Sequence, residues 1–381
     1  MVMTEERFRL MTHLFSDTEK LAWLRLIRSE NVGPITFYRL LEQFGTASKA
    51  LDALPELARK GGRKKKIAIC SKSDAEREMT ELAEIGAEVI VRDEDSYPPL
   101  LSHVEDAPPV LCVRGHTHLL KKKAVAIVGA RNATLNGCKF AGQIARDLGE
   151  GGLLVVSGLA RGVDGAAHAA ALESGTVGVQ GGGVDVIYPR ENASLYKEMT
   201  LRGCVIAEPK LGTKPQARHF PRRNRIISGM CRAIVVVEAS PRSGSLITAR
   251  MALEQGREVF AVPGSPLDPR AAGTNGLIRE GAHLLENAQN IFYELESLKN
   301  TPLNERKYQY FQDVKTTLPG EKELTEARKV IVESLSISPV CVDEIIRQCQ
   351  ISASVVQTVL LELELAGHVE RHPGNMVSSI I

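Results

Sequence analysis

Residues 124–163 read AVAIVGARNATLNGCKFAGQIARDLGEGGLLVVSGLARGV, and this stretch sets the architecture of the chain. It contains a short apolar run at 124–128, a stretch with helical spacing, and a second apolar run at 153–157. A glycine follows each run directly. Short β-branched runs separated by helices are typical of parallel strands that are buried on both faces of a sheet. The stretch therefore predicts one β-α-β unit of an α/β domain.

The same alternation continues toward the C-terminus. Further β-branched runs occupy residues 176–179, 204–207, 233–238 and 258–262, with helical stretches between them. We expect a Rossmann-like α/β core, in which a parallel sheet carries helices on both faces. Ligands of such sheets bind beyond the carboxyl ends of the strands, so the loops after these runs are where a site is expected.

Small and cationic residues follow the first three predicted strands. Arg131 follows the first strand, Gly158, Arg161 and Gly162 follow the second, and Gly182 lies in a triple-glycine turn after the third. Glycine lets the backbone approach a ligand closely, and arginine supplies positive charge. These loops therefore predict a phosphate-binding rim.

A serine-containing turn follows the fifth predicted strand. Ser243, Gly244 and Ser245 precede a helical stretch at 246–255. Either serine can cap that helix, and the free N–H groups of a helix start favour anions. A second phosphate contact is expected here.

Residues 219–225, HFPRRNR, form the most basic short segment of the central region. Guanidinium groups match phosphate oxygens in pairs, and the ring of Phe220 offers a face on which a base can stack. Pro221 suits the first position of a helix, which would place the arginines in its first turn. The alternative is a solvated basic helix start.

The three arginines of this segment are expected to differ in role. Arg222 and Arg225 are predicted to face a nucleic acid strand, while Arg223 falls between them and is expected to be solvated. Asn224 is included among the predicted DNA contacts.

Several cofactor motifs are absent. No GxGxxG follows the first predicted strand, Ser157 ends the second strand where a dinucleotide site would have an acidic residue, and no GxxxxGK[ST] occurs. The seven cysteines include no CxxC pair, which favours reduced thiols over a metal site. We therefore expect no cofactor and no metal.

Catalysis is the competing interpretation. Asp164 and His168 are four residues apart on a helix and could form an acid–base pair, although an aspartate that binds amides at the helix start is more common. A Rossmann-like hydrolase of nucleotides or sugar phosphates would use Asp164, Asp185 or Glu238. Our preferred interpretation has no catalytic residue.

Charge and hydropathy restrict the partners. The 381 residues carry a net charge of +2, but residues 1–66 hold 13 basic against 8 acidic side chains and residues 121–285 hold 22 against 13. A polyanion is expected to bind these two regions. There is no apolar run long enough for a membrane span and no signal-peptide pattern, so we expect a cytoplasmic protein without membrane contact.

Two smaller modules flank the core. Residues 1–66 predict a helical module of the helix-hairpin-helix or sterile-alpha-motif type, in which Gly33 permits a tight turn, and the basic run at 59–66 favours a solvated tether. The core with its acidic lead-in covers 67–300, and residues 301–320 form a linker.

Residues 321–381 predict a winged helix. Its recognition helix would span 354–366 and carries Glu362 and Glu364 without any lysine or arginine. Partner docking is therefore favoured over reading a duplex, and a scaffold role for this tail is a third hypothesis.

Four motifs, SGLARGVDGAAH, DVIYPRENASLY, HFPRRNRIISG and VVVEASPRSGSLITARMALEQGREVFAVPG, resemble the DNA-processing protein A (DprA, or Smf) family in order and spacing. The resemblance covers about residues 94–290. It implies a core that binds single-stranded DNA, forms homodimers, and loads the RecA recombinase on incoming strands during natural transformation.

The resemblance also implies roles for individual residues. It gives Arg131, Arg161, Arg222, Arg225 and the Ser243–Gly244–Ser245 turn as phosphate contacts, Phe220 as a base contact, and Gly158, Gly162 and Gly182 as the pocket floor. A lysine that relatives often carry before FPRRNR, residues 220–225, would be replaced by Lys214, Arg218 or His219.

The resemblance places the dimer contact on the core. Our candidate face is 275–285, with Leu277, Ile278 and Leu285, and ordinary core packing of these leucines is the alternative.

Overall fold

The computed structural model describes residues 15–300, 320–372 and 374–380. The chain divides into two compact units, which we call the core unit, Glu76–Pro302, and the flanking unit, Asp17–Ala75 with Leu303–Ile381. The N-terminal module and the winged helix, predicted as separate domains, thus belong to one unit. The predicted linker at 301–320 lies outside the described residues except for Gly320.

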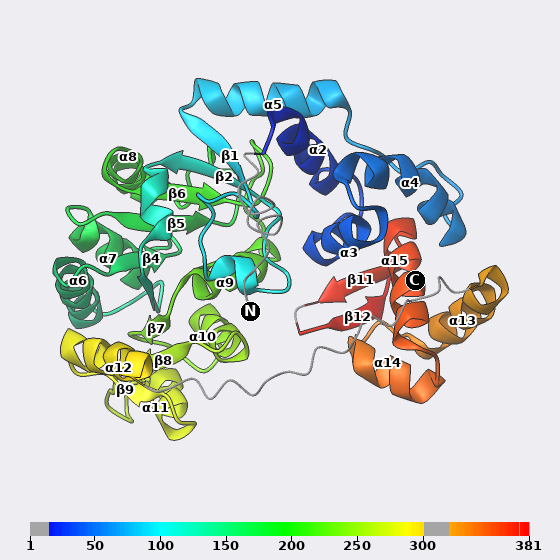
Figure 1. The fold of residues 1–381 in the computed structure, drawn as a ribbon. Coiled ribbons are helices and arrows are strands. Elements are labelled where there is room, and N and C mark those ends of the chain that lie inside the picture. The colour runs from blue at the N-terminus through cyan, green and yellow to red at the C-terminus, as the bar shows by residue number, and fades with distance from the viewer. Residues whose placement is uncertain (1–14, 301–319, 373, 381) are drawn as a thin grey trace. The chain divides into compact units, whose positions relative to one another are not determined.

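A nine-stranded sheet forms the centre of the core unit (Figure 1), with the order β1-β2-β6-β5-β4-β3-β7-β8-β9. From β6 to β9 all neighbours are parallel, as the alternation predicted. The antiparallel strands β1 and β2 extend one edge and were not predicted, nor was the two-residue β9. The strands are β1 (Ala87–Val91), β2 (Val110–Gly115), β3 (Ala124–Val128), β4 (Leu154–Ser157), β5 (Thr176–Gln180), β6 (Cys204–Ala207), β7 (Ala233–Val236), β8 (Glu258–Ala261) and β9 (His283–Leu284).

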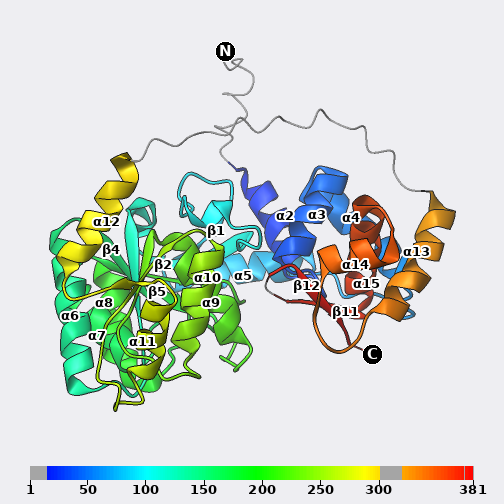
Figure 2. The same cartoon turned by 90° about the horizontal axis from the view of Figure 1, so that it is seen from below.

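Helices cover both faces of this sheet. Alternate residues of β3 enter two different hydrophobic cores: Val125 and Ile127 belong to one, and Ala126 and Val128 to the other. Because side chains alternate across a strand, β3 is covered on both sides. Figures 1 and 2 show α6, α7 and α12 on the first side and α9 and α10 on the second. The helices of this unit are α6 (Leu135–Glu150), α7 (Val163–Ala171), α8 (Ala193–Arg202), α9 (His219–Met230), α10 (Gly244–Glu254), α11 (Ala272–Arg279) and α12 (Ala288–Asn300), and α5 (Lys72–Glu84) contains the boundary between the units.

The N-terminal part of the flanking unit is helical. It consists of α2 (Asp17–Ile27), α3 (Pro34–Phe44) and α4 (Ala47–Lys60). Gly33 precedes α3 in an extended conformation, and Pro34 takes the first helical position, where its missing N–H is not needed.

The C-terminal part of the flanking unit is a winged helix, as predicted. A three-stranded sheet of order β10-β12-β11 joins three helices. The elements are α13 (Glu321–Ser334), β10 (Val340–Cys341), α14 (Val342–Cys349), α15 (Ala353–Ala366), β11 (Val369–His372) and β12 (Met376–Ser379). No helix within the described residues is both long and apolar enough to cross a membrane.

Candidate nucleic-acid interface

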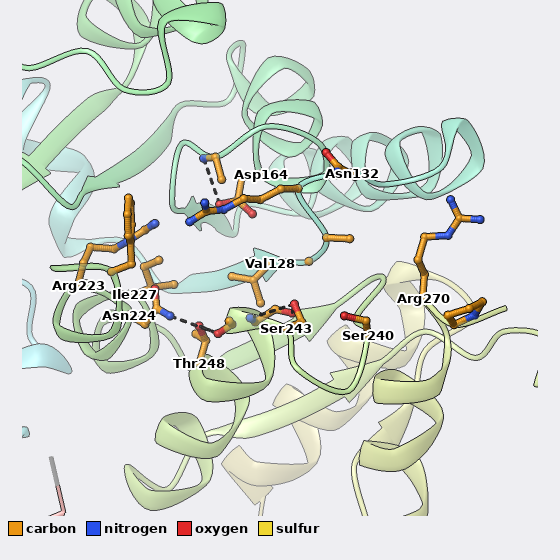
Figure 3. A pocket seen from close by; sticks show the side chains of 18 of the residues that line it. Val128, Asn132, Asp164, Arg223, Asn224, Ile227, Ser240, Ser243, Thr248 and Arg270 are labelled. Atoms are coloured by element: carbon orange, nitrogen blue, oxygen red, sulfur yellow. Dashed lines mark hydrogen bonds between the residues drawn. The ribbon is translucent and has the colours of Figure 1, made fainter. Parts of the chain in front are cut away.

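A cavity of about 750 Å³ lies at the carboxyl ends of the strands, between β3 and β7. At this point the strand order changes direction, because the chain runs from β3 to β6 on one side and from β7 to β9 on the other. Ligands of open α/β sheets bind at such a switch point. The loops after β3, β7 and β8 and one face of α9 line the cavity (Figure 3).

One face of α9 supplies the cavity wall. Phe220, Arg223, Asn224 and Ile227 line it, and their spacing of three, four and seven residues is that of a single helix face. This spacing was visible in the sequence, but of the four residues only Phe220 and Asn224 were among the predicted DNA contacts. The helix begins at His219, so Pro221 is its third residue and not its first as predicted.

Arg223 is not solvated, and that prediction was wrong. Its side chain lines the cavity although the residue is only 6% exposed. Its Nε and Nη1 find no hydrogen-bond partner among the described residues. Donors of this kind are costly to bury unless a ligand binds them. Two donors of Arg223 are thus buried without a partner among the described residues, while its side chain lines an open volume.

The carboxylate of Asp164 provides the countercharge. It lines the same cavity and accepts a hydrogen bond from the Ala160 N–H at 3.3 Å. Burial raises the pKa of Asp164, although the nearby Arg223 opposes that shift. Burial also lowers the pKa of Arg223 to about 10. The charge of Asp164 raises this pKa, and the charge of Arg131 lowers it further. Arg223 stays positively charged at neutral pH.

Arg225 has a different environment from the one predicted. Its Nη2 donates to both carboxylate oxygens of Glu208 at 2.6 and 2.7 Å, and its Nε lies 3.4 Å from Asp106. The residue is 5% exposed and does not line the cavity. Arg225 thus joins α9 to two segments of the core unit, and we correct its prediction as a side chain that faces a strand.

The start of α10 forms the opposite wall, as predicted. Ser243 caps the helix by accepting a hydrogen bond from the Ser245 N–H at 3.4 Å, and the two hydroxyls lie 2.7 Å apart. Asn224 donates to the Gly244 carbonyl at 3.3 Å, which ties α9 to this turn. The cavity therefore receives two hydroxyls and a helix start, a combination that favours an anion.

An aromatic surface borders the cavity. The Arg131 guanidinium lies 4.9 Å from the centre of the Phe220 ring, within cation–π distance. The ring of Tyr188, which is 42% exposed, lies 5.8 Å from Phe220. A flat ligand group can stack here.

The three glycines predicted for the pocket floor do not line the cavity themselves. A Cβ at Gly158 would lie 1.6 Å from Nη1 of Arg223, and one at Gly162, whose φ is +74°, would lie 2.4 Å from the Ala130 carbonyl oxygen. A Cβ at Gly182 would meet the Thr213 carbonyl oxygen at 2.5 Å. Each glycine thus permits a close approach of the segments that build the site.

The other predicted cations lie outside the cavity lining. Lys214, Arg218 and Arg222 are exposed, and Arg161 is exposed with Glu191 at 3.5 Å. His219 is half-buried, and burial, followed by the charges of Arg218 and Arg222, lowers its pKa.

Sequence reasoning missed part of the lining. Arg270 lies across from Arg223 in Figure 3 and pairs with Asp268 at 3.0 Å. Asn132, Ser240, Thr248 and Arg270 also line the cavity and were not predicted as contacts.

The candidate acid–base groups have other partners. Asp185 accepts a hydrogen bond from the Gly212 N–H at 3.0 Å, and Glu238 accepts one from the Thr134 N–H at 3.0 Å. His168 is fully buried, and its Nδ1 lies 2.8 Å from the Thr176 hydroxyl. Burial lowers the pKa of His168 to about 3. His168 does not line the cavity with Asp164.

The predicted dimer residues pack inside the protomer. Leu277 is 8% exposed in one hydrophobic core, with Ile278 packed against it, and Leu285 is fully buried in the other. Core packing, the alternative, is what the structure shows for these side chains. Leu284, in the same segment, is 46% exposed.

The sequence matches three family descriptions. Residues 88–296 match "DNA recombination-mediator protein A", residues 17–80 match "DprA-like N-terminal HHH domain", and residues 315–375 match "DprA winged helix domain". Of the two types predicted for the N-terminal module, helix-hairpin-helix and sterile alpha motif, the second match supports the helix-hairpin-helix.

Curated relatives and solved structures agree with this assignment. DNA processing protein DprA of Bacillus subtilis (strain 168) is 44% identical over 222 residues, 58% of this chain and 75% of the relative. Protein Smf of Synechocystis sp. is 31% identical over 394 residues, 94% and 98% of the two chains. The X-ray structure of DNA processing protein A from Streptococcus pneumoniae has a TM-score of 0.60 at 34% identity and covers 77% of this chain and 99% of that one.

A structure of DNA processing protein A from Helicobacter pylori, described for its single-stranded DNA binding mode, has a TM-score of 0.52 at 29% identity, with 57% and 98% coverage. These similarities extend over the sheet, the cavity loops and both flanking modules. The chain belongs to the DNA processing protein A (DprA/Smf) family of recombination-mediator proteins.

Proposed function

We propose that the cavity binds single-stranded DNA and that the protein acts as a recombination mediator without catalysis. The observation that carries the proposal is Arg223, a buried arginine with unused donors beside a cavity at the switch point of the sheet. The solved Helicobacter pylori relative, described for its binding of single-stranded DNA, supports the choice of ligand.

Phosphate groups would bind between α9 and α10. Arg223 supplies the charge, and the hydroxyls of Ser243 and Ser245 and the N–H groups at the start of α10 supply further donors. Charge-assisted bonds from a guanidinium in a partly desolvated site are stronger than those on the surface. Because these contacts are to phosphate, little sequence preference is expected.

The aromatic surface explains the preference for a single strand. A base can stack on Phe220 only when it is unpaired and free to turn out of the strand. A cavity of about 750 Å³ suits a nucleotide or a few groups of a flexible chain and not a double helix.

The family supports further proposals. We infer that the protein protects incoming single strands, loads RecA on them during natural transformation, works as a homodimer, and is cytoplasmic. Leu284 is the exposed apolar side chain of the segment 275–285 and is our revised candidate for the dimer contact. A second site on a dimer would raise avidity, because the next contact becomes intramolecular.

The decisive test is the double variant Arg223→Met with Asp164→Asn, which removes both buried charges together so that neither is left uncompensated. We expect affinity for labelled oligo-dT, measured by fluorescence anisotropy, to fall about 100-fold, while the melting temperature changes little. The matched control is Arg146→Ala, an exposed arginine outside the cavity lining. A folded double variant with wild-type affinity would refute the proposal.

The hydrolase alternative has its own readout. The wild-type protein is incubated with a panel of nucleotides, and release of base or phosphate is followed by chromatography. Release that disappears in Asp164→Asn would show a catalytic cavity and overturn the non-catalytic assignment.

A further inference from the structure

The two modules of the flanking unit are in close contact through α4 and α15. Gly61 follows α4, and a Cβ at this position would lie 2.0 Å from the Glu362 carbonyl oxygen and 2.8 Å from the Ala366 Cβ. Asn31, which follows α2, donates its Nδ2 hydrogen to the Leu365 carbonyl oxygen at 3.2 Å. The backbone of α15 therefore touches the N-terminal module directly.

The contact covers the helix that a winged helix normally offers to DNA. Of the buried residues of α15, Val355, Val356, Val359, Leu360 and Leu363 belong to the core of the winged helix itself. Leu361 and Leu365 are 3% and 0% exposed but lie outside that core. Both sides of the C-terminal part of α15 are thus covered, whereas Ala353 and Ser354 at its start are exposed.

The same contact covers the hairpin of the N-terminal module. In residues 31–34, NVGP, the backbone turns into α3, and no acidic residue occupies the first turn of that helix. A Cβ at Gly33 would lie 3.9 Å from Oε1 of Glu364. A carboxylate from α15 thus lies where the glycine would let a phosphate approach the start of α3.

Glu364 is held at this position by an arginine of the winged helix. Arg371 of the winged helix donates through Nε to its Oε2 at 3.0 Å. Burial raises the pKa of Glu364, whereas Arg371, Thr36 and Arg39 act in the opposite direction, and the last two belong to α3. The charge of Arg39 thus adds to that of Arg371 in favouring the ionised carboxylate.

We propose that the contact between α15 and the N-terminal module is autoinhibitory, and that it withholds the hairpin at 31–34 from the phosphate backbone of duplex DNA. Glu364 occupies the place of a phosphate, and the contact must open before the hairpin can bind. The inference is independent of the single-strand cavity in the core unit.

The test uses the full chain with Gly61→Trp as a wedge. Gly61 has φ −68° and ψ 0°, so a tryptophan introduces no backbone strain and only the contact with α15 must give way. The matched control is Gly320→Trp, which has an ordinary φ of −66° and no atom within 4 Å of the added Cβ. Gly61→Ala is a milder variant of the same wedge, for use if the tryptophan prevents folding.

Hydrogen exchange in α15 and duplex affinity in a gel shift are measured together. We expect faster exchange and about tenfold tighter duplex binding for Gly61→Trp, a smaller gain for Gly61→Ala, and no gain for Gly320→Trp. Affinity for oligo-dT should stay within about twofold, because the cavity is unchanged.

Adding Gly33→Val to the wedge tests the hairpin itself. Gly33 has an extended backbone, φ −91° and ψ 176°, which any residue adopts, so valine should block the phosphate without unfolding the module. The duplex gain should then disappear. The proposal would be overturned if hydrogen exchange in α15 became faster without tighter duplex binding, or if the tighter duplex binding persisted in the variant with Gly33→Val. Unchanged hydrogen exchange in a folded Gly61→Trp protein would also overturn it.

Discussion

The cavity in the core unit and the α4–α15 contact in the flanking unit both bury arginines near carboxylates, but they do so differently. In the contact, Arg371 binds Glu364 directly at 3.0 Å, and its Nη1 and Nη2, which lack hydrogen-bond partners among the described residues, do not line the cavity. In the cavity, Arg223 keeps Nε and Nη1 without hydrogen-bond partners among the described residues, and Asp164 is bound to a backbone N–H. A buried arginine can recognise a ligand only where it has spare donors next to an open volume, and Arg223 meets both conditions.

Arg225 sharpens this comparison. It lies on the same helix as Arg223, but like Arg371 it binds a carboxylate directly. Arg225→Ala would leave Glu208 and Asp106, which are 20% and 27% exposed, without their cation. We expect the free energy of unfolding in urea to fall by about 2–3 kcal/mol, somewhat less than for a fully buried pair. Affinity for oligo-dT of the folded protein should hardly change.

The control for this variant is Arg222→Ala, whose side chain is exposed and whose stability should change by less than about 0.5 kcal/mol. The opposite pattern, stability kept and affinity lost in Arg225→Ala, would return Arg225 to the DNA contacts.

Phe220 tests whether the cavity recognises bases as well as phosphates. Phe220→Ala removes the stacking surface and should cost about 1–2 kcal/mol of affinity for oligo-dT. Phe220→Tyr keeps the ring and should bind like the wild type, which anisotropy titrations can establish. Equal affinities of all three proteins would reduce the site to phosphate contacts alone.

Substitution of an arginine on the phosphate-binding rim should have the smallest effect on affinity for oligo-dT. Arg161 is 53% exposed, and an exposed cation acts mainly through counterion release. Arg161→Ala should lower the slope of log affinity against log salt concentration by about 0.7, with only a modest loss at physiological salt. Arg146→Ala should leave the slope unchanged, and a slope that is flat in the wild type would contradict electrostatic binding altogether.

Much of the fold could be predicted because its signals are local. The run at 124–128 became β3 and that at 204–207 became β6 without a shift of boundary, since strands buried on both faces are apolar along their whole length. The antiparallel strand β1 was missed because its AEVIV run lies in an acidic stretch. The winged helix was found through its two helices and hairpin.

The site was predicted in outline and corrected in detail. The loops after β3 and β7 contribute Arg131 and Ser243 as expected, because strand ends converge on one edge of the sheet. Arg223, predicted to be solvated, lines the cavity, and Arg225, predicted to face the strand, is held in a buried ion pair. Their partners Asp164 and Glu208 lie far from them in the chain, so no local pattern could show which arginine would be neutralised.

Sequence alone was sufficient for the alternation of strands and helices, the glycine turns, the basic segment at 219–225 and the family, since each is written in neighbouring residues. Folding assigned the burial of Arg223, the ion pairs of Arg225 and the packing of α15 on α4. These features depend on contacts between residues distant in the chain, and the environment of a charge is set by the groups that packing brings to it.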